Sequence, residues 1–319
     1  MNNKFDFDDI NLIPKYSVVD SRSQCDTSVR FGKHVFKNPV IPANMESVID
    51  EEIAIKLASE NFFYIMHRFG IDNLSFIKKM KELNLVSSIS IGVNSDSYDL
   101  IDSLVQSDLI PDYITIDIAH GHSKKLKKML KYLKEGRWKN EMKDCFIIAG
   151  NVSTIEATVD LDKWGADAIK VGIGPGSSCT TYPTTGFGSR NIQASVVNEC
   201  ASVSKKPIIA DGGIKFPADI TKSIVMGATM IMVGGMLSSF TDSPGRTVEQ
   251  DGKLYKEFYG SASAKQSNKT SRIEGTVKLN PMKNSTIIDY LNYLSECLQS
   301  SISYGGGKVL NDLYAVKWI

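Results

Sequence analysis

The sequence has no C-x-x-C pair, and its 319 residues include only five cysteines. Scattered cysteines in odd number argue against a disulfide framework and against a zinc site built from paired thiolates. We expect reduced thiols at Cys25, Cys145, Cys179, Cys200 and Cys297. Cys145 opens an apolar run and Cys297 lies in a helical pattern, so both are interpreted as core residues. Cys179 has no such neighbours and needs another explanation.

Long hydrophobic runs and an excess of one charge are also missing. No stretch approaches the about 18 apolar residues that a membrane span needs, and the first residues, MNNKFDFDDINLIPK, are acidic. The chain has 37 Lys and Arg against 36 Asp and Glu, a net charge of +1. It therefore shows no overall attraction to nucleic acid or to an acidic membrane. We expect a cytoplasmic protein that binds neither.

Two nucleotide-binding signatures are absent as well. The chain lacks G-x-x-x-x-G-K-[ST], which excludes a nucleoside triphosphatase of the P-loop kind, and it has no Rossmann fingerprint. A small anionic ligand would therefore need a local site of another design.

What the sequence does contain is an alternation of short apolar runs with longer amphipathic stretches. Strands that are apolar throughout and separated by helices indicate a parallel sheet, and eight such units favour an α/β fold closed into a (β/α)8 TIM barrel. A doubly wound open sheet is the alternative. The eight strands are expected at 38–45, 62–68, 86–92, 113–119, 145–152, 168–174, 207–213 and 229–235.

The remaining segments are assigned to the same single barrel domain, 1–319. Residues 1–37 are expected to form an N-terminal leader with a small hairpin. Residues 241–285 are polar and rich in Ser, Lys, Asn and Gly, which is typical of a lid or a disordered segment. Since they follow the eighth strand, we predict a mobile flap over the barrel mouth. Residues 286–319 are expected to form a C-terminal helix and tail.

Chemically distinctive residues fall where the predicted strands end, which is where barrels place their catalytic groups. They are Asn44, Met45, His67, Arg68, Asp117, Asn151, 174–179, Asp211, Gly234 and Gly235. The sequences "ADGG" and "VGG" end the seventh and eighth strands, where barrels commonly bind phosphate through backbone N–H groups. The alternative is that these glycines only make tight turns. A bare inward carboxylate is costly, so Asp211 should have a hydrogen-bond donor as its partner. A ribose could supply its hydroxyls to this carboxylate.

The stretch "GIGPGSSCTTYPTTGFGS", residues 172–189, follows the sixth strand and has no helical or strand periodicity. It should place Cys179 at the same mouth, within reach of a nucleotide held beside strands seven and eight. Nearby backbone N–H groups favour a thiolate, and Thr180 and Thr181 offer hydroxyls for proton handling. The alternative is an inert small residue in a glycine loop.

This cysteine loop, with "FDFDDINLIP", "PVIPANM", "IDIAHGHS", "IAGNV", "PIIADGGI" and "EFYGSAS", resembles the IMP dehydrogenase and GMP reductase family across nearly the whole chain. The "PANME" to "YIMHRF" block and "IDIAHGHS" resemble the GMP reductase branch, and no regulatory domain is inserted after the second strand. IMP dehydrogenase, acting on IMP with NAD, is the nearest alternative. Its flap carries an Arg-Tyr pair, whereas Arg246 and Arg272 precede Thr247 and Ile273 here. A catalytically silent purine-nucleotide-binding barrel is the other alternative.

The resemblance implies an NADPH-dependent oxidoreductase of purine interconversion that converts GMP to IMP and ammonia. Cys179 would attack C2 of the purine, ammonia would leave, and the covalent thioimidate would take hydride at C2. Thr181 and Glu274 match the family pair that handles the proton of the leaving amine. Without the resemblance, Glu274 would be interpreted as an exposed loop acid.

The resemblance also assigns ligand contacts. Substrate-binding positions are Ser177, Asp211, Gly212, Gly213, Gly234, Gly235, Gly260, Ser261, Ala262, Arg272 and Gly275. Cofactor-binding positions are Arg68, Asp117, Ala119, His120, Gly172, Ser301 and Tyr304. For Arg68, a salt bridge at the start of a helix is the alternative. His120 and His122 fit no metal spacing and are interpreted as solvent-facing or cofactor-adjacent.

Two further features follow from the resemblance. The backbone carbonyls of Gly174, Gly176 and Cys179 match a monovalent-cation site, with K⁺ as the expected ion. The family often has a basic residue after the two threonines, where Tyr182 and Pro183 stand here. The segment "SISYGGGK", 301–308, resembles one that reaches the neighbouring subunit's cofactor site, which implies a homotetramer.

Overall fold

The structure is a computed structural model that describes residues 4–260, 263 and 275–319. Four residues assigned from the sequence lie outside the described residues: Ser261, Ala262, Arg272 and Glu274.

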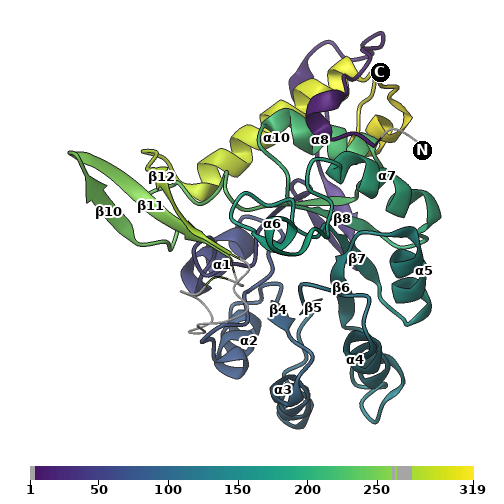
Figure 1. The fold of residues 1–319 in the computed structure, drawn as a ribbon, viewed down its shortest axis with the longest axis vertical. Helices are drawn as coiled ribbons and strands as arrows, with labels where there is room; N and C mark the ends of the chain where they lie inside the picture. Colours follow the sequence, from purple (N-terminus) through teal and green to yellow (C-terminus); the bar gives the residue numbers. More distant parts are fainter. Residues whose placement is uncertain (1–3, 261–262, 264–274) are drawn as a thin grey trace.

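Seven parallel strands form one curled sheet at the centre of the molecule (Figure 1). They are β3 (Val40–Pro42), β4 (Ser88–Ile91), β5 (Tyr113–Asp117), β6 (Phe146–Val152), β7 (Ala168–Val171), β8 (Ile208–Asp211) and β9 (Met230–Val233). Their order is β3-β9-β8-β7-β6-β5-β4, so the first strand pairs with the last, and Val40 lies opposite Ile231. With helices alternating between the strands, this is a (β/α)8 barrel, as the sequence predicts.

The expected second strand, 62–68, differs from the prediction. Within the described residues it forms a single bridge, between Met66 and Ile89, with one backbone hydrogen bond of 3.1 Å from Met66 to Ser88. The side chains of residues 62–66 are nevertheless buried. Burial thus holds this segment in the barrel wall without a regular ladder.

The helices of the barrel follow the strands in the expected alternation. They are α1 (Glu51–Ser59), α2 (Asn73–Glu82), α3 (Ser95–Gln106), α4 (Lys124–Glu135), α5 (Ile155–Lys163), α7 (Gln193–Val203), α8 (Pro217–Val225) and α10 (Ile287–Tyr304), with the short α6 (Thr181–Thr185) before α7. Side chains of Asp50, Asp72, Ser123 and Thr154 accept hydrogen bonds from the first turns of α1, α2, α4 and α5. Such caps satisfy the N–H groups that a helix start leaves unpaired and fix where the helix begins.

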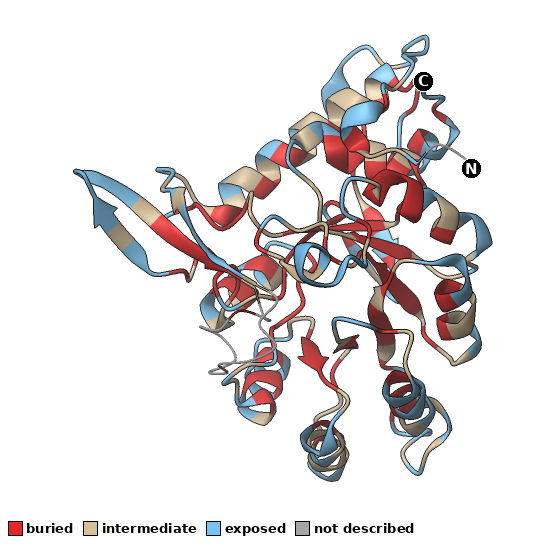
Figure 2. Cartoon of the chain, viewed as in Figure 1, coloured by how far each residue is buried: buried red, intermediate tan, exposed pale blue. Residues whose placement is uncertain are grey.

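Burial explains why the strands are apolar throughout. All four residues of β4, β7 and β9 are buried, and Figure 2 shows buried residues along the central strands, with exposed residues on the outer faces of the helices. A strand covered on both faces cannot alternate apolar with polar residues. The same logic applies to the C-terminal helix α10, which buries Ile287, Leu291, Leu294, Leu298 and Ile302 along one stripe.

The amino-terminal ends of the strands are closed by a hairpin of β1 (Val29–Phe31) and β2 (His34–Phe36). The ring of Phe31 lies 5.2 Å from Phe63 and 4.9 Å from Phe146, measured between centroids, and Phe36 lies 4.9 Å from Phe63. Because β5 and β6 begin at Tyr113 and Phe146, this aromatic cluster plugs the end of the barrel opposite the strand carboxyl ends. The site must therefore be sought at the other end.

The polar segment after β9 contains an antiparallel sheet that the sequence analysis did not predict. It consists of β10 (Thr247–Gln250), β11 (Lys253–Tyr259) and β12 (Val277–Pro281), and it projects from the barrel (Figure 1). Its outer residues are mostly exposed, which accounts for the polar composition. The end of β11 is buried, and Phe258 packs under Gly234, where an added Cβ would lie 3.4 Å from the Phe258 ring. This sheet is thus anchored beside the eighth barrel strand.

The two ends of the described chain meet beside α8 and α10 (Figure 1). Short 3₁₀ helices lie at Phe7–Asp9, Arg22–Gln24 and Leu310–Ala315. Backbone hydrogen bonds of 2.8 Å and 3.0 Å connect Asn11 with Ile319 in both directions.

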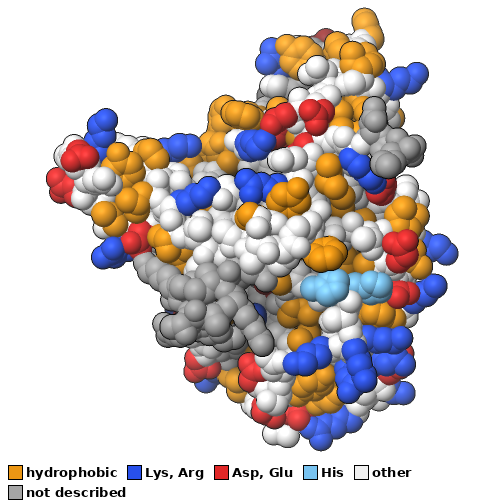
Figure 3. Space-filling model, viewed as in Figure 1, with side chains coloured by type: hydrophobic (Ala, Val, Ile, Leu, Met, Phe, Trp, Pro, Cys, Tyr) orange, Lys and Arg blue, Asp and Glu red, His pale blue; other side chains and the backbone are white. Residues whose placement is uncertain are grey.

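Two surface properties bear on partners. No helix in the described part of the chain is long and apolar enough to cross a membrane. Figure 3 shows Lys and Arg side chains gathered over the part of this face where α4 lies in Figure 1, and α4 has exposed lysines at 124, 125, 127, 128 and 131. This basic patch is local, and the near-zero net charge of the chain does not reveal it.

Candidate active site

A cavity of about 570 Å³ lies at the carboxyl ends of the barrel strands. It brings together residues that are far apart in the sequence but mostly lie in or just after the carboxyl-terminal parts of strands, as expected for a barrel. Its lining includes Asn44, Met45, Arg68, Asp117, Ala119, Asn151, Lys170, Gly172, Gly174, Gly176, Cys179, Thr181, Asp211, Gly212 and Gly260.

Cys179 is half-buried in this lining. Its thiol donates a hydrogen bond of 3.2 Å to the hydroxyl oxygen of Thr181. The backbone of Cys179 forms an antiparallel bridge with Gly275, and the N–H of Thr276 donates to the carbonyl of Ser178 over 3.0 Å. The described end of the 241–285 segment therefore contacts the cysteine loop directly.

The two glycine pairs, Gly212–Gly213 and Gly234–Gly235, differ in whether their backbone conformation requires glycine. Gly212 and Gly213 have φ of +89° and +84°, a region in which other residues are strained. Gly234 and Gly235 have no such φ, so turn geometry alone does not explain them. A Cβ on Gly235 would lie 3.5 Å from the Ser177 hydroxyl and 3.6 Å from the Phe258 ring. Gly235 thus lies beside Ser177, after β9, whereas Gly212, after β8, lies against Pro175 and Gly176 of the cysteine loop.

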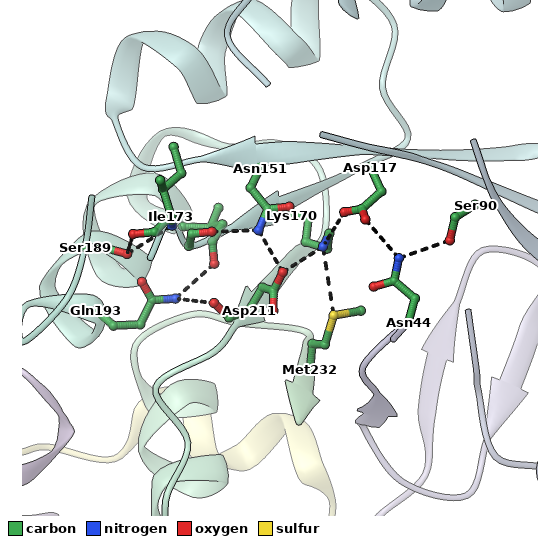
Figure 4. A network of polar contacts seen from close by, with 12 residues as sticks. Asn44, Ser90, Asp117, Asn151, Lys170, Ile173, Ser189, Gln193, Asp211 and Met232 are labelled. Carbon is green, nitrogen blue, oxygen red and sulfur yellow. Dashed lines mark hydrogen bonds and ion pairs between the residues drawn. The ribbon is translucent and has the colours of Figure 1, made fainter. Parts of the chain in front are cut away.

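Lys170 is a site residue that the sequence analysis missed. Its Nζ lies 2.7 Å from Oδ1 of Asp117 and 2.7 Å from Oδ2 of Asp211, and its side chain is only 3% exposed. Figure 4 shows the ammonium between the two carboxylates. A lysine inside the apolar strand "AIKVGIG" was the available signal, since a buried charge must have a partner.

Two asparagines complete this network from the neighbouring strands (Figure 4). Asn44 donates to Oδ2 of Asp117 and to the hydroxyl of Ser90, each over 3.1 Å. Asn151 donates to Oδ2 of Asp211 over 2.7 Å. Asp211 therefore has partners within the chain itself, beyond the ribose that the sequence analysis expected to satisfy it. Within the described residues its bonds from Lys170 and Asn151 both end on Oδ2, which leaves Oδ1 for a ligand.

The electrostatics of this network keep Asp117 and Lys170 charged. Burial alone would raise the pKa of Asp117, but the positive charge of Lys170 and the hydrogen bonds from Lys170 and Asn44 hold that pKa below its usual value. Burial alone would lower the pKa of Lys170, but the charges of Asp117 and Asp211 raise it above its usual value.

Of the residues assigned to the cofactor, Arg68, Asp117, Ala119 and Gly172 line the cavity. The Arg68 guanidinium lies 4.6 Å from the Phe69 ring centroid, and the alternative salt bridge at a helix start is not formed among the described residues. Gly172 has φ of +141°, and a Cβ there would lie 2.1 Å from the carbonyl oxygen of Asp211, so only glycine fits.

Three residues assigned to the cofactor lie outside this lining. His120 is exposed at the end of the β5 loop, while its neighbour His122 bonds to Asp160 over 2.9 Å. Ser301 and Tyr304, on α10, line a separate cavity of about 350 Å³. Within one chain they are not brought together with Asp117.

The described residues include no group of three or more His, Cys, Asp or Glu side chains placed to hold a metal ion. A cation held by backbone carbonyls is a different kind of site. The Gly176 carbonyl already accepts a 3.1 Å hydrogen bond from the N–H of Cys179, although a carbonyl oxygen has a second lone pair. This hydrogen bond therefore leaves one lone pair of the Gly176 carbonyl oxygen for another partner.

The lining also contains an acceptor without a partner. The side-chain oxygen of Asn151 is buried and unpaired within the described part of the chain, although its amide nitrogen bonds to Asp211 and to the Gly172 carbonyl. Buried polar atoms are normally paired, so a ligand donor at this point would complete the asparagine. The residues present therefore suit a polar ligand such as a nucleotide or a nicotinamide cofactor.

The cavity lies at the carboxyl ends of the barrel strands, and a cysteine thiol lies beside a hydroxyl in its wall. This arrangement is that of a (β/α)8-barrel enzyme. The chain belongs to the IMP dehydrogenase / GMP reductase family, since the model of that domain matches residues 4–317. It is 52% identical over 315 residues to a GMP reductase of Albidiferax ferrireducens, covering 99% of this chain and 95% of the relative. A GMP reductase of Mycoplasma mycoides is 51% identical over 98% of this chain and 95% of its own length. A GMP reductase of Bacillus subtilis is 49% identical over 100% and 96%.

Proposed function

We propose that this chain is a GMP reductase, an oxidoreductase that converts GMP to IMP and ammonia with NADPH. The single observation that carries the proposal is the placement of the Cys179 thiol next to the Thr181 hydroxyl in the barrel-mouth cavity. Relatives named GMP reductase, about half identical over nearly the whole chain, support it.

Cys179 acts as the nucleophile. Its sulfur bonds to C2 of the guanine ring, the C2–N bond breaks, and the exocyclic nitrogen leaves as ammonia after gaining a proton. Thr181, with Glu274, delivers that proton, because an unprotonated amine is a poor leaving group. NADPH supplies a hydride to C2 when bound. The C–S bond then breaks, which releases IMP and restores the thiol.

The other residues bind and orient. Ser177 and the backbones of Gly212, Gly213, Gly234 and Gly235 hold the phosphate, and Oδ1 of Asp211 accepts from the ribose. Gly260, Ser261, Ala262, Arg272 and Gly275 contact the substrate. Asp117, Arg68, Ala119, His120 and Gly172 face the cofactor.

We further propose a homotetramer in the cytoplasm. In it Ser301 and Tyr304 would reach the cofactor site of a neighbouring subunit, which agrees with their distance from Asp117 within one chain. A K⁺ ion would be held by the carbonyls of Gly174, Gly176 and Cys179 and would fix the glycine loop.

The competing functions are separated by parallel incubations of the protein with GMP plus NADPH and with IMP plus NAD. A GMP reductase consumes NADPH and releases one ammonia per cofactor oxidised. An IMP dehydrogenase instead forms NADH in the second mixture without ammonia release. Binding of GMP without turnover in either mixture would favour a silent nucleotide-binding barrel.

A further inference from the structure

Lys170 joins two carboxylates that serve different parts of the proposed site. Asp117 ends β5 and lies on the cofactor side, whereas Asp211 ends β8 beside the glycine turn at Gly212. One ammonium lies 2.7 Å from an oxygen of each. Since both carboxylates are within hydrogen-bonding distance of the same nitrogen, neither can move without affecting the other.

The surroundings of Lys170 hold its ammonium in this place. A Cβ added to Gly150 would lie 2.7 Å from the Lys170 Cβ, so the neighbouring strand packs directly against the lysine stem. Nζ also lies 3.9 Å from the sulfur of Met232, on the strand beyond β8. A side chain that is 3% exposed and packed in this way has no solvent-facing alternative.

We propose that Lys170 is a positioning residue that couples nucleotide binding to cofactor binding by holding Asp117 and Asp211 in one fixed arrangement. The inference rests on the proposed function, which places Asp117 at the cofactor and Asp211 at the ribose. Without the ammonium, two like charges share a buried site, so they move apart or one of them binds a proton. Movement misaligns the acceptors of both ligands, and protonation removes one acceptor while the loss of the shared ammonium frees the other carboxylate to shift.

The test measures equilibrium binding of GMP and of NADPH to wild type and to Lys170→Met. The variant should bind each ligand about 10- to 100-fold more weakly, the loss typical of a misplaced charged hydrogen-bonding group. Lys256→Met is the matched control. Lys256 is also a buried lysine, at 6% exposure, but its Nζ donates to the backbone carbonyl of Ser243 over 2.9 Å and touches neither carboxylate. Lys256→Met can lower the free energy of unfolding, but it should leave the affinities for GMP and for NADPH unchanged.

The single carboxylate variants show which ligand each acid serves. Asp211→Asn should weaken GMP binding much more than NADPH binding, and Asp117→Asn should do the reverse, whereas Lys170→Met weakens both. Adding Lys170→Met to Asp211→Asn should cost little further GMP affinity, because the lysine acts on GMP through Asp211.

Binding of 2′-deoxy-GMP shows whether Lys170→Met acts by misplacing Asp211 or by damaging the fold in general. If Lys170 acts through the ribose contact of Asp211, wild type and Lys170→Met should differ far less in binding 2′-deoxy-GMP than in binding GMP. Equal losses for the two nucleotides, or unchanged GMP and NADPH binding in Lys170→Met, would overturn the inference. If the Met variant does not fold, Lys170→Gln, which keeps a donor but removes the charge, is measured in its place. Wild type that binds neither GMP nor NADPH would instead contradict the proposed function.

Discussion

The thiol of Cys179 and the hydroxyl of Thr181 lie 3.2 Å apart, joined by a hydrogen bond at the wall of the barrel-mouth cavity. A nucleophile next to a group that can pass a proton is the arrangement that amine displacement needs. The hydrogen bond links residues two positions apart, across the start of α6, so the loop itself sets their distance.

Cys179→Ala should abolish GMP reduction and leave GMP binding measurable. In the proposed mechanism the thiol forms the bond to the purine, whereas the glycine turns after β8 and β9 hold the phosphate. Turnover is followed by NADPH absorbance, and binding by calorimetry. Substantial turnover in the variant would rule out covalent catalysis by this cysteine.

Glu274→Gln should impair ammonia release and have less effect on hydride transfer. Glutamine keeps the shape and loses the titrating group, and loss of a positioned acid or base typically slows its step by about 10²- to 10⁴-fold. Single-turnover reduction of GMP is compared with reduction of NADP by IMP, which needs Cys179 but no ammonia. An equal fall in both rates would show that Glu274 acts by positioning, not by proton transfer.

Gly212→Ala should weaken GMP binding about tenfold or more. The position has φ of +89°, and an added Cβ would lie 3.1 Å from Pro175 and 3.2 Å from the backbone nitrogen of Gly176, so the cysteine loop must shift. Gly252→Ala is the control, since its φ is +70° and no atom lies within 4 Å of the added Cβ. Both variants carry about 1–2 kcal/mol of backbone strain, but only Gly212→Ala should change the Kd for GMP.

Phe31→Ala should lower the free energy of unfolding by about 3–5 kcal/mol without changing the Kd for GMP. Phe31 is fully buried in the aromatic cluster at the closed end of the barrel, away from the cavity. Tyr16→Ala, at a side chain that is 89% exposed, should stay within about 0.5 kcal/mol of wild type. Denaturant unfolding measures both, and a small effect of Phe31→Ala would show that the hairpin is not part of the core.

The barrel could be predicted from the sequence because its strands are buried on both faces and its helices carry one apolar stripe, as in β7 and α10. The sheet of β10 to β12 could not be predicted in this way. Its outer residues are exposed, and its two edge strands, β10 and β12, come from separate parts of the chain. About half of the residues that line the cavity were predicted from their places at strand ends, and the family resemblance added Ala119, Gly172, Thr181, Gly212 and Gly260. Lys170 was missed because it lies inside a strand, and its partners Asp117 and Asp211 become neighbours only when the barrel closes.

The most direct test of the central claim, that Cys179 bonds to C2 of the purine, mixes the protein with IMP and NADP in the absence of ammonia. Sulfur then adds to C2, the hydrogen at C2 leaves as hydride to NADP, and the thiol proton passes to solvent. The account predicts a burst of one NADPH per active chain and, after rapid acid quenching and digestion, a purine nucleotide attached to the peptide that contains Cys179. A burst of NADPH with no purine on that peptide, or an equal burst from Cys179→Ala, would contradict it.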